Sequence, residues 1–172
     1  VVREAAEWRL IALLFECPGP EWAAQLQAIA SEIDDALLKS GVEAACQEAS
    51  PGLYHTTFGP GGPAAPREVS YRSGELPGNA LAELRGVYQA FAYEPALPEA
   101  PDHVAVETGF VAYLRLKRAY AVARGAHEPA GVTHACGEGA HRRVAGLLAI
   151  TAQDPHRGDP GFVSLQRSPR QA

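Results

Sequence analysis

The sequence of 172 residues lacks several features that define common classes of protein. It has no run of about 18 apolar residues, so we expect no segment that spans a membrane. The first residues include Glu4 and Glu7 and lack the basic start and long apolar core of a secretory signal. Cysteine is scarce, and Cys17, Cys46 and Cys136 are too widely spaced to form a disulfide framework. We therefore expect a protein of the reducing cytoplasm.

Positive charge is scarce in the first hundred residues, which hold 6 Lys and Arg against 14 Asp and Glu. The remaining residues hold 9 Lys and Arg against 6 Asp and Glu, and the whole chain carries a net charge of −5. Binding to nucleic acid requires a dense basic surface that neutralises phosphates, so nucleic acid is not expected as a partner. The acidic portion is compatible with a cationic peptide or protein partner, although charge alone favours helices whose acids face water.

The apolar pattern predicts an all-α protein, because apolar residues recur at helical spacing and no segment alternates as a strand does. Helices are expected at about 3–16, 21–38, 42–49, 79–93, from 102 or 103 to 124, and 138–152. Asn79 and Asp102 are candidate N-caps, and Gly125 is suited to the position after a helix C-terminus. The stretch from Leu53 to Phe58 fits either a helical turn or an extended segment.

Two further stretches have little regular pattern. Residues 59–66 contain several Gly and Pro residues and predict a loop that lies over the helices. Residues 154–172 are expected to form a poorly structured tail. We therefore predict one helical bundle over residues 1–153, with the tail following it.

Standard catalytic and cofactor motifs are missing from the chain. The glycine-proline loop lacks the Gly-Lys-Ser/Thr ending of a phosphate-binding loop and follows no predicted strand. No local signature supports a catalytic Cys-His pair. His134, Cys136 and His141 lie close together and leave a small metal-binding protein open as an alternative, although their spacing matches no standard zinc site.

One polar cluster is not explained by helix formation alone. Glu99, Asp102 and His103 lie within five residues at the start of the longest predicted helix, and Glu107 follows one turn later. Asp102 as an N-cap accounts for itself, but not for His103 and Glu107 on a face that also carries Phe110. An arginine side chain binds well to an acid beside an apolar wall. The cluster is therefore a candidate site for an arginine-bearing partner.

Three stretches together resemble one known family. The first is Glu99-Ala-Pro-Asp102-His103, followed by a helix that contains Val106-Glu107 and Phe110. The second runs from Leu53 and Tyr54 through Phe58-Gly59-Pro60-Gly61 to Pro66-Arg67-Glu68-Val69-Ser70-Tyr71. The third is Arg9-Leu10-Ile11-Ala12-Leu13-Leu14-Phe15, which a proline turn follows. Over residues 5–125 the chain is thus similar to the TorD/DmsD/NarJ family of redox-enzyme maturation chaperones.

The resemblance implies an all-α cytoplasmic chaperone of the TorD-like type, not an enzyme, with no cofactor of its own. Its partner would be the catalytic subunit of a molybdenum-cofactor-containing oxidoreductase. The chaperone would bind that subunit's twin-arginine leader or remnant N-terminus and hold the apoprotein until the cofactor is inserted. Both a monomer and a domain-swapped dimer are compatible with the resemblance. A helical protein-binding adaptor with no role in metalloenzyme assembly is the alternative.

The same resemblance suggests which residues form the peptide site. Glu99, Asp102 and His103 would meet the arginines, with Glu107 as a further candidate. An apolar wall for the hydrophobic part of the leader would be formed by Tyr54, Phe58 and Tyr71.

Overall fold

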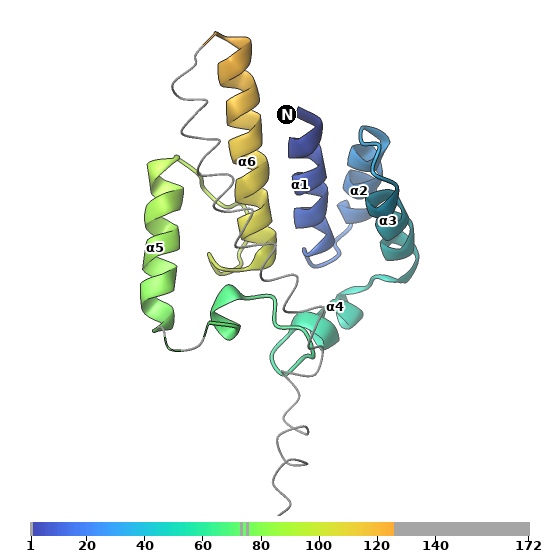
Figure 1. Ribbon diagram of the computed structural model, residues 1–172. Helices are drawn as coiled ribbons and strands as arrows, with labels where there is room; N and C mark the ends of the chain where they lie inside the picture. The colour runs from blue at the N-terminus through green and yellow to red at the C-terminus, as the bar shows by residue number, and fades with distance from the viewer. Residues whose placement is uncertain (1, 73, 75, 126–172) are drawn as a thin grey trace, which may run out of the picture.

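The computed structural model describes residues 2–72, 74 and 76–125 (Figure 1). The helices over these residues are α1 (Val2–Leu14), α2 (Trp22–Ser31), α3 (Ala36–Glu48), α4 (Pro51–Phe58), α5 (Pro77–Ala90) and α6 (Val104–Ala123), with a single 3₁₀ turn, η1, at Glu68–Ser70. The described residues contain no β-strand, and the predicted all-α class is confirmed.

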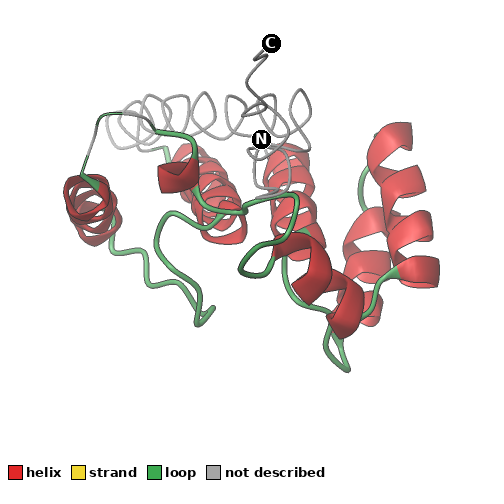
Figure 2. Ribbon diagram, turned by 90° about the horizontal axis from the view of Figure 1, so that it is seen from below, coloured by secondary structure: helices red, strands yellow, loops and turns green. Residues whose placement is uncertain are grey.

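Helix α1 lies at the centre of the fold. It packs along α6 on one side and against α2 and α3 on the other, while α5 lies on the far side of α6 (Figure 1). Seen from below, the helices stand in a row with α4 and the loop after it at their near ends (Figure 2). The candidate site is at this end of the molecule.

The two sides of α1 belong to two different hydrophobic cores. Trp8 packs with Phe110 and other residues of α5 and α6, and Phe110 is only 1% exposed. Leu10 and Leu13 pack with Trp22 and Leu26 of α2, and the Trp22 indole donates to the Leu13 carbonyl at 2.7 Å. Because these large apolar side chains leave water on both sides of α1, this helix holds the two halves of the row together.

The single helix predicted at 21–38 is wrong. Helix α2 ends at Ser31, and α3 begins after Asp35, whose carboxylate accepts from the Leu38 amide at 2.9 Å. Ile33 lies between the two helices and is 1% exposed, so it fills a core position without being helical. The prediction failed because apolar spacing continued through a break that Asp35 caps.

Helix α3 starts earlier than the helix expected at 42–49 and ends at Glu48. The stretch from Leu53 to Phe58, for which a helical turn and an extended segment were both open, is helical and belongs to α4. Ser50 caps α4 by accepting from the Leu53 amide at 3.2 Å, and a proline takes the first helical position.

Asn79 is not the N-cap of α5. That helix begins at Pro77 after Leu76, and no side chain caps it. Proline at the first helical position needs no partner for an amide N–H, which is why the helix can start there.

Helix α6 lies within the range predicted for it and ends before Gly125, which has a φ of +71° as a residue after a helix terminus often does. The packing of Tyr93 explains why a glycine, Gly109, stands in the middle of this helix. A Cβ there would lie 2.9 Å from the Tyr93 hydroxyl oxygen. That hydroxyl donates to the Val106 carbonyl at 3.3 Å, so the glycine lets the aromatic cluster between α5 and α6 close against the helix.

The helix predicted at 138–152 and the tail at 154–172 lie outside the described residues. Among the residues that the structure describes, no helix combines the length and the apolar character needed to cross a bilayer.

Candidate functional site

The start of α6 is capped by a histidine rather than by an aspartate. His103 has the extended backbone of an N-cap residue, with φ −74° and ψ 136°, and its ring Nδ1 accepts from the Ala105 amide at 3.2 Å. The prediction that Asp102 caps this helix is therefore wrong. The chain before α6 pairs with the loop at Arg67. Asp102 therefore lies one residue before the N-cap position, and its side chain binds Arg67 instead of the helix.

That pairing is a short antiparallel contact between the loop and the helix start. Arg67 and His103 form an isolated β-bridge. The Glu68 amide donates to the Asp102 carbonyl at 3.0 Å, and the Val104 amide donates to the Pro66 carbonyl at 2.8 Å. The second of these bonds satisfies an amide of the first turn of α6 that has no partner within the helix. The glycine-proline loop is thus fastened to the mouth of α6.

Asp102 strengthens this fastening with a buried charge. Its side chain is completely buried, and its Oδ1 accepts from Arg67 Nε at 3.0 Å and Nη2 at 2.8 Å. Its Oδ2 accepts from the Val69 amide at 3.3 Å. Both carboxylate oxygens are therefore engaged within the protein. Asp102 positions the loop and does not face a partner.

His103 is 3% exposed and connects the helix start to α4. Its Nε2 lies 3.4 Å from the Tyr54 hydroxyl oxygen, across 49 residues of sequence. Burial lowers the pKa of His103 and Arg67 adds to this effect, although Glu99 and Asp102 act in the opposite direction. The imidazole is therefore held in its neutral form, as an N-cap acceptor must be.

Tyr54 is half-buried, and its burial, together with the carboxylate of Glu99, raises its pKa to about 12. The hydroxyl thus keeps its proton at any physiological pH. Its ring packs on Phe58 at 5.4 Å between centroids, and Phe58 in turn meets Phe15 of the first core edge-on at 5.7 Å. These two aromatic side chains of α4 form a wall at the lower end of the row of helices.

A cleft of about 630 Å³ lies against this wall. It is bounded by α4, by the glycine-proline loop and by the mouth of α6. Its lining residues are Tyr54, His55, Phe58, Gly59, Pro60, Gly61, Gly62, Ala65, Pro66, Arg67, Ser70, Glu99 and His103. Glu99 is exposed at its edge, and Arg67 is about 40% exposed within it. Arg67 is neutralised by Asp102 and His103 is neutral, so Glu99 leaves the polar end of the cleft with one net negative charge.

A smaller and more apolar hollow of about 240 Å³ adjoins the cleft. Tyr54 and Phe58 line both spaces, while Trp22, Leu14 and Leu53 contribute to the second. Cys17 lies near this boundary, with its Sγ 4.0 Å from His55 Nε2. The aromatic wall therefore has a polar cleft on one side and an apolar hollow on the other.

The structure brings four of the predicted site residues to one cleft: Glu99, His103, Tyr54 and Phe58. It places the other three elsewhere. Asp102 is buried beside Arg67, and Glu107 is 2% exposed within α6. Tyr71 packs against the core and donates to the Ala65 carbonyl at 3.0 Å, which holds the loop in shape.

Arg67 is the functional neighbour that sequence reasoning missed. It lies 35 residues before Asp102, and no helical or strand spacing connects the two. The signal that could have found it is chemical, since a buried aspartate needs a cation. Arg85 and Arg115 lie closer to Asp102 in the sequence, so sequence distance alone does not select Arg67.

The described residues contain no group of three or more His, Cys, Asp or Glu side chains that could hold a metal ion. The candidate metal ligands His134, Cys136 and His141 lie outside the described residues.

The fold and the cleft define an all-α protein with an open, partly apolar recess where a loop meets the mouth of a long helix. A family model described as nitrate reductase delta subunit matches residues 19–136, which include the loop, the cleft and α6. The chain belongs to this family, which is a family of molybdoenzyme maturation chaperones, and the predicted resemblance is confirmed. Neither the curated proteins nor the solved structures contain a match to the chain.

Proposed function

We propose that the chain is a cytoplasmic chaperone whose cleft binds the N-terminal segment of a molybdenum-cofactor-containing oxidoreductase catalytic subunit. That segment is a twin-arginine leader or its remnant. By holding it, the chaperone keeps the apoprotein from export or assembly until the cofactor is inserted. The observation that carries this proposal is the cleft itself, in which an acid from the linker before α6 faces an aromatic wall from α4.

The chemistry of the cleft suits an arginine side chain. A guanidinium binds a carboxylate through two parallel hydrogen bonds, and its flat face stacks on aromatic rings. Glu99 supplies the carboxylate, while Tyr54 and Phe58 supply the rings. Asp102 and Arg67 are not contacts in this proposal. They hold the loop and the helix mouth in register, so that the acid and the wall face one another.

The size of the recess suits a peptide rather than a single side chain. A cleft of about 630 Å³ falls within the range of pockets that enclose drug-sized ligands. The adjoining apolar hollow offers room for the hydrophobic part of the same segment.

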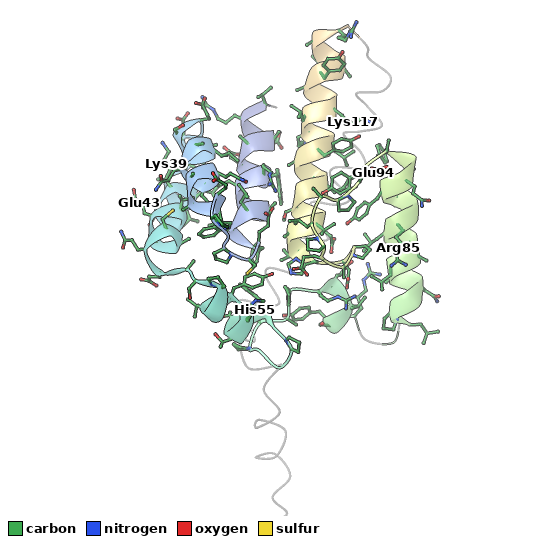
Figure 3. All side chains as sticks on the ribbon, turned by 180° about the vertical axis from the view of Figure 1, so that it is seen from behind. Lys39, Glu43, His55, Arg85, Glu94 and Lys117 are labelled. Carbon is green, nitrogen blue, oxygen red and sulfur yellow. The ribbon has the colours of Figure 1, made fainter. Side chains whose placement is uncertain are left out.

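The test compares two charge-removing variants of the same linker, Glu99→Gln and Glu94→Gln. Glu94 is also exposed, and Figure 3 shows it beside the middle of α6, away from His55 on α4 at the lower end. The probe is a synthetic N-terminal leader peptide that carries two adjacent arginines followed by an apolar segment, titrated by calorimetry. We expect Glu99→Gln to weaken binding about five- to thirtyfold, which corresponds to about 1–2 kcal/mol for a charged hydrogen bond, and Glu94→Gln to leave it unchanged.

A second peptide, with its arginines replaced by glutamine, completes a double-mutant cycle. If Glu99 contacts an arginine, the Glu99→Gln change costs nothing further with this peptide. Equal losses with both peptides would place the arginines elsewhere. If the parent protein binds neither peptide, the leader-binding function is wrong and the adaptor alternative is favoured.

A further inference from the structure

The hydrogen bonds at the mouth of α6 have a direction, and that direction determines what the cleft offers to its occupant. The Ala105 N–H is a donor, so the His103 Nδ1 that accepts from it carries no proton. A neutral imidazole with an unprotonated Nδ1 carries its proton on Nε2. The Nε2–H therefore donates to the Tyr54 hydroxyl oxygen, which lies 3.4 Å away.

This leaves the hydroxyl proton of Tyr54 turned away from His103. Tyr54 lines the cleft, and its hydroxyl then has a proton to donate to an acceptor there. His103 is 3% exposed, which keeps water from competing for its Nε2. The opposite tautomer would set an Nδ1–H against the Ala105 N–H, two donors facing one another in a buried place.

We infer that Tyr54, oriented by His103, donates its hydroxyl proton to a main-chain carbonyl oxygen of the bound peptide. This inference rests on the proposed function and adds a second requirement to it. Glu99 is an acceptor for a cationic side chain, whereas Tyr54 is a donor for the backbone beside that side chain. His103 acts through Tyr54 and is a positioning residue.

The charges around His103 agree with this arrangement. Glu99 and Asp102 attract a proton to the ring and Arg67 repels it, while burial disfavours the charged form. Asp102 is engaged by Arg67 and by the Val69 amide, so its carboxylate has no need of a histidine N–H. The neutral ring can then accept from the Ala105 amide through Nδ1 and donate to the Tyr54 hydroxyl oxygen through Nε2.

The first test is spectroscopic and needs no peptide. Long-range ¹H–¹⁵N correlation of the parent protein at neutral pH identifies which ring nitrogen of His103 carries the proton, with His103→Asn to assign the signals. We expect the proton on Nε2. A proton on Nδ1, or on both nitrogens, overturns the inference even if the protein binds its peptide.

The second test measures affinity for the N-terminal peptide described above. Tyr54→Phe keeps the ring and removes only the hydroxyl, and we expect it to weaken binding about three- to tenfold, as for one neutral hydrogen bond. The matched control is Tyr120→Phe, since Tyr120 is 60% exposed near the far end of α6. We expect that control to bind as the parent does.

The third test separates positioning from packing. Asparagine is a good N-cap, so His103→Asn keeps an acceptor for the Ala105 amide but cannot orient Tyr54. We expect it to lose affinity as Tyr54→Phe does, and the double variant to lose no more than either alone. Additive losses, or a Tyr54→Phe variant that binds as tightly as the parent, would overturn the inference. A parent protein that binds no peptide instead contradicts the proposed function, whichever tautomer is found.

Discussion

The ion pair between Asp102 and Arg67 gives the sharpest test of how the site is built. In Asp102→Asn the side chain keeps its size but loses its charge, so Arg67 loses its counter-ion and two charge-assisted hydrogen bonds. In the parent protein the Val69 N–H donates to a carboxylate oxygen of Asp102. The amide group of asparagine would place a second donor near that N–H. The variant therefore weakens both the loop and its attachment to α6.

The size of the effect follows from how far each partner is buried. Breaking a fully buried ion pair costs about 3–5 kcal/mol, because one charge stays behind without water. Here the Arg67 side chain is about 40% exposed and can recover hydration, whereas Asp102 is completely buried. We therefore expect a loss of about 2–3 kcal/mol in the free energy of unfolding, or a fall of roughly 4–12 °C in Tm for a chain of this size.

The assay is urea denaturation followed by circular dichroism, with a second ion pair as control. Arg3 and Asp34 also form an ion pair, but their side chains are 61% and 74% exposed. We expect Asp34→Asn to change stability by less than about 0.5 kcal/mol, as exposed pairs do. An Asp102→Asn variant as stable as the parent that nevertheless fails to bind peptide would refute the reasoning, because it would make Asp102 a direct contact.

Two further outcomes are expected. Burial lowers the pKa of His103 from 6.5 in the folded state, so the unfolded chain takes up the proton first. Stability should then fall as the pH drops below about 6.5, and the pH dependence of urea unfolding should be shallower in His103→Asn. Gly86→Ala meets nothing within 4 Å in α5 and should stabilise by about 0.5–1 kcal/mol, whereas Gly109→Ala meets the Tyr93 hydroxyl and should give no such gain in the same measurement.

The sequence was most informative where local chemistry sets the structure. The length of α6 followed from its apolar spacing and from Gly125, and the motif from Glu99 to His103 marked the place where the cleft lies. Periodicity failed between α2 and α3, because Ile33 is buried in the link between these helices while keeping a helical spacing.

Local chemistry did not predict which residue of the motif from Glu99 to His103 caps α6 and which one is buried. Asp102 is a better N-cap than histidine by propensity, yet the bridge between Arg67 and His103 shifts the helix start by one residue. That shift turns Asp102 inward and gives the cap to His103. It depends on a partner 35 residues earlier in the chain, which no local pattern contains.

The aromatic wall of the cleft stands on α4, which is the one α-helix among the described residues that has no buried residue. Helix α4 has eight residues, none of them buried, and a Pro-Gly pair at each end. A guest that covers Tyr54 and Phe58 would supply the burial that α4 lacks on its own. Because a ligand that binds only the folded form stabilises it, the binding of such a guest and the stability of α4 would be linked.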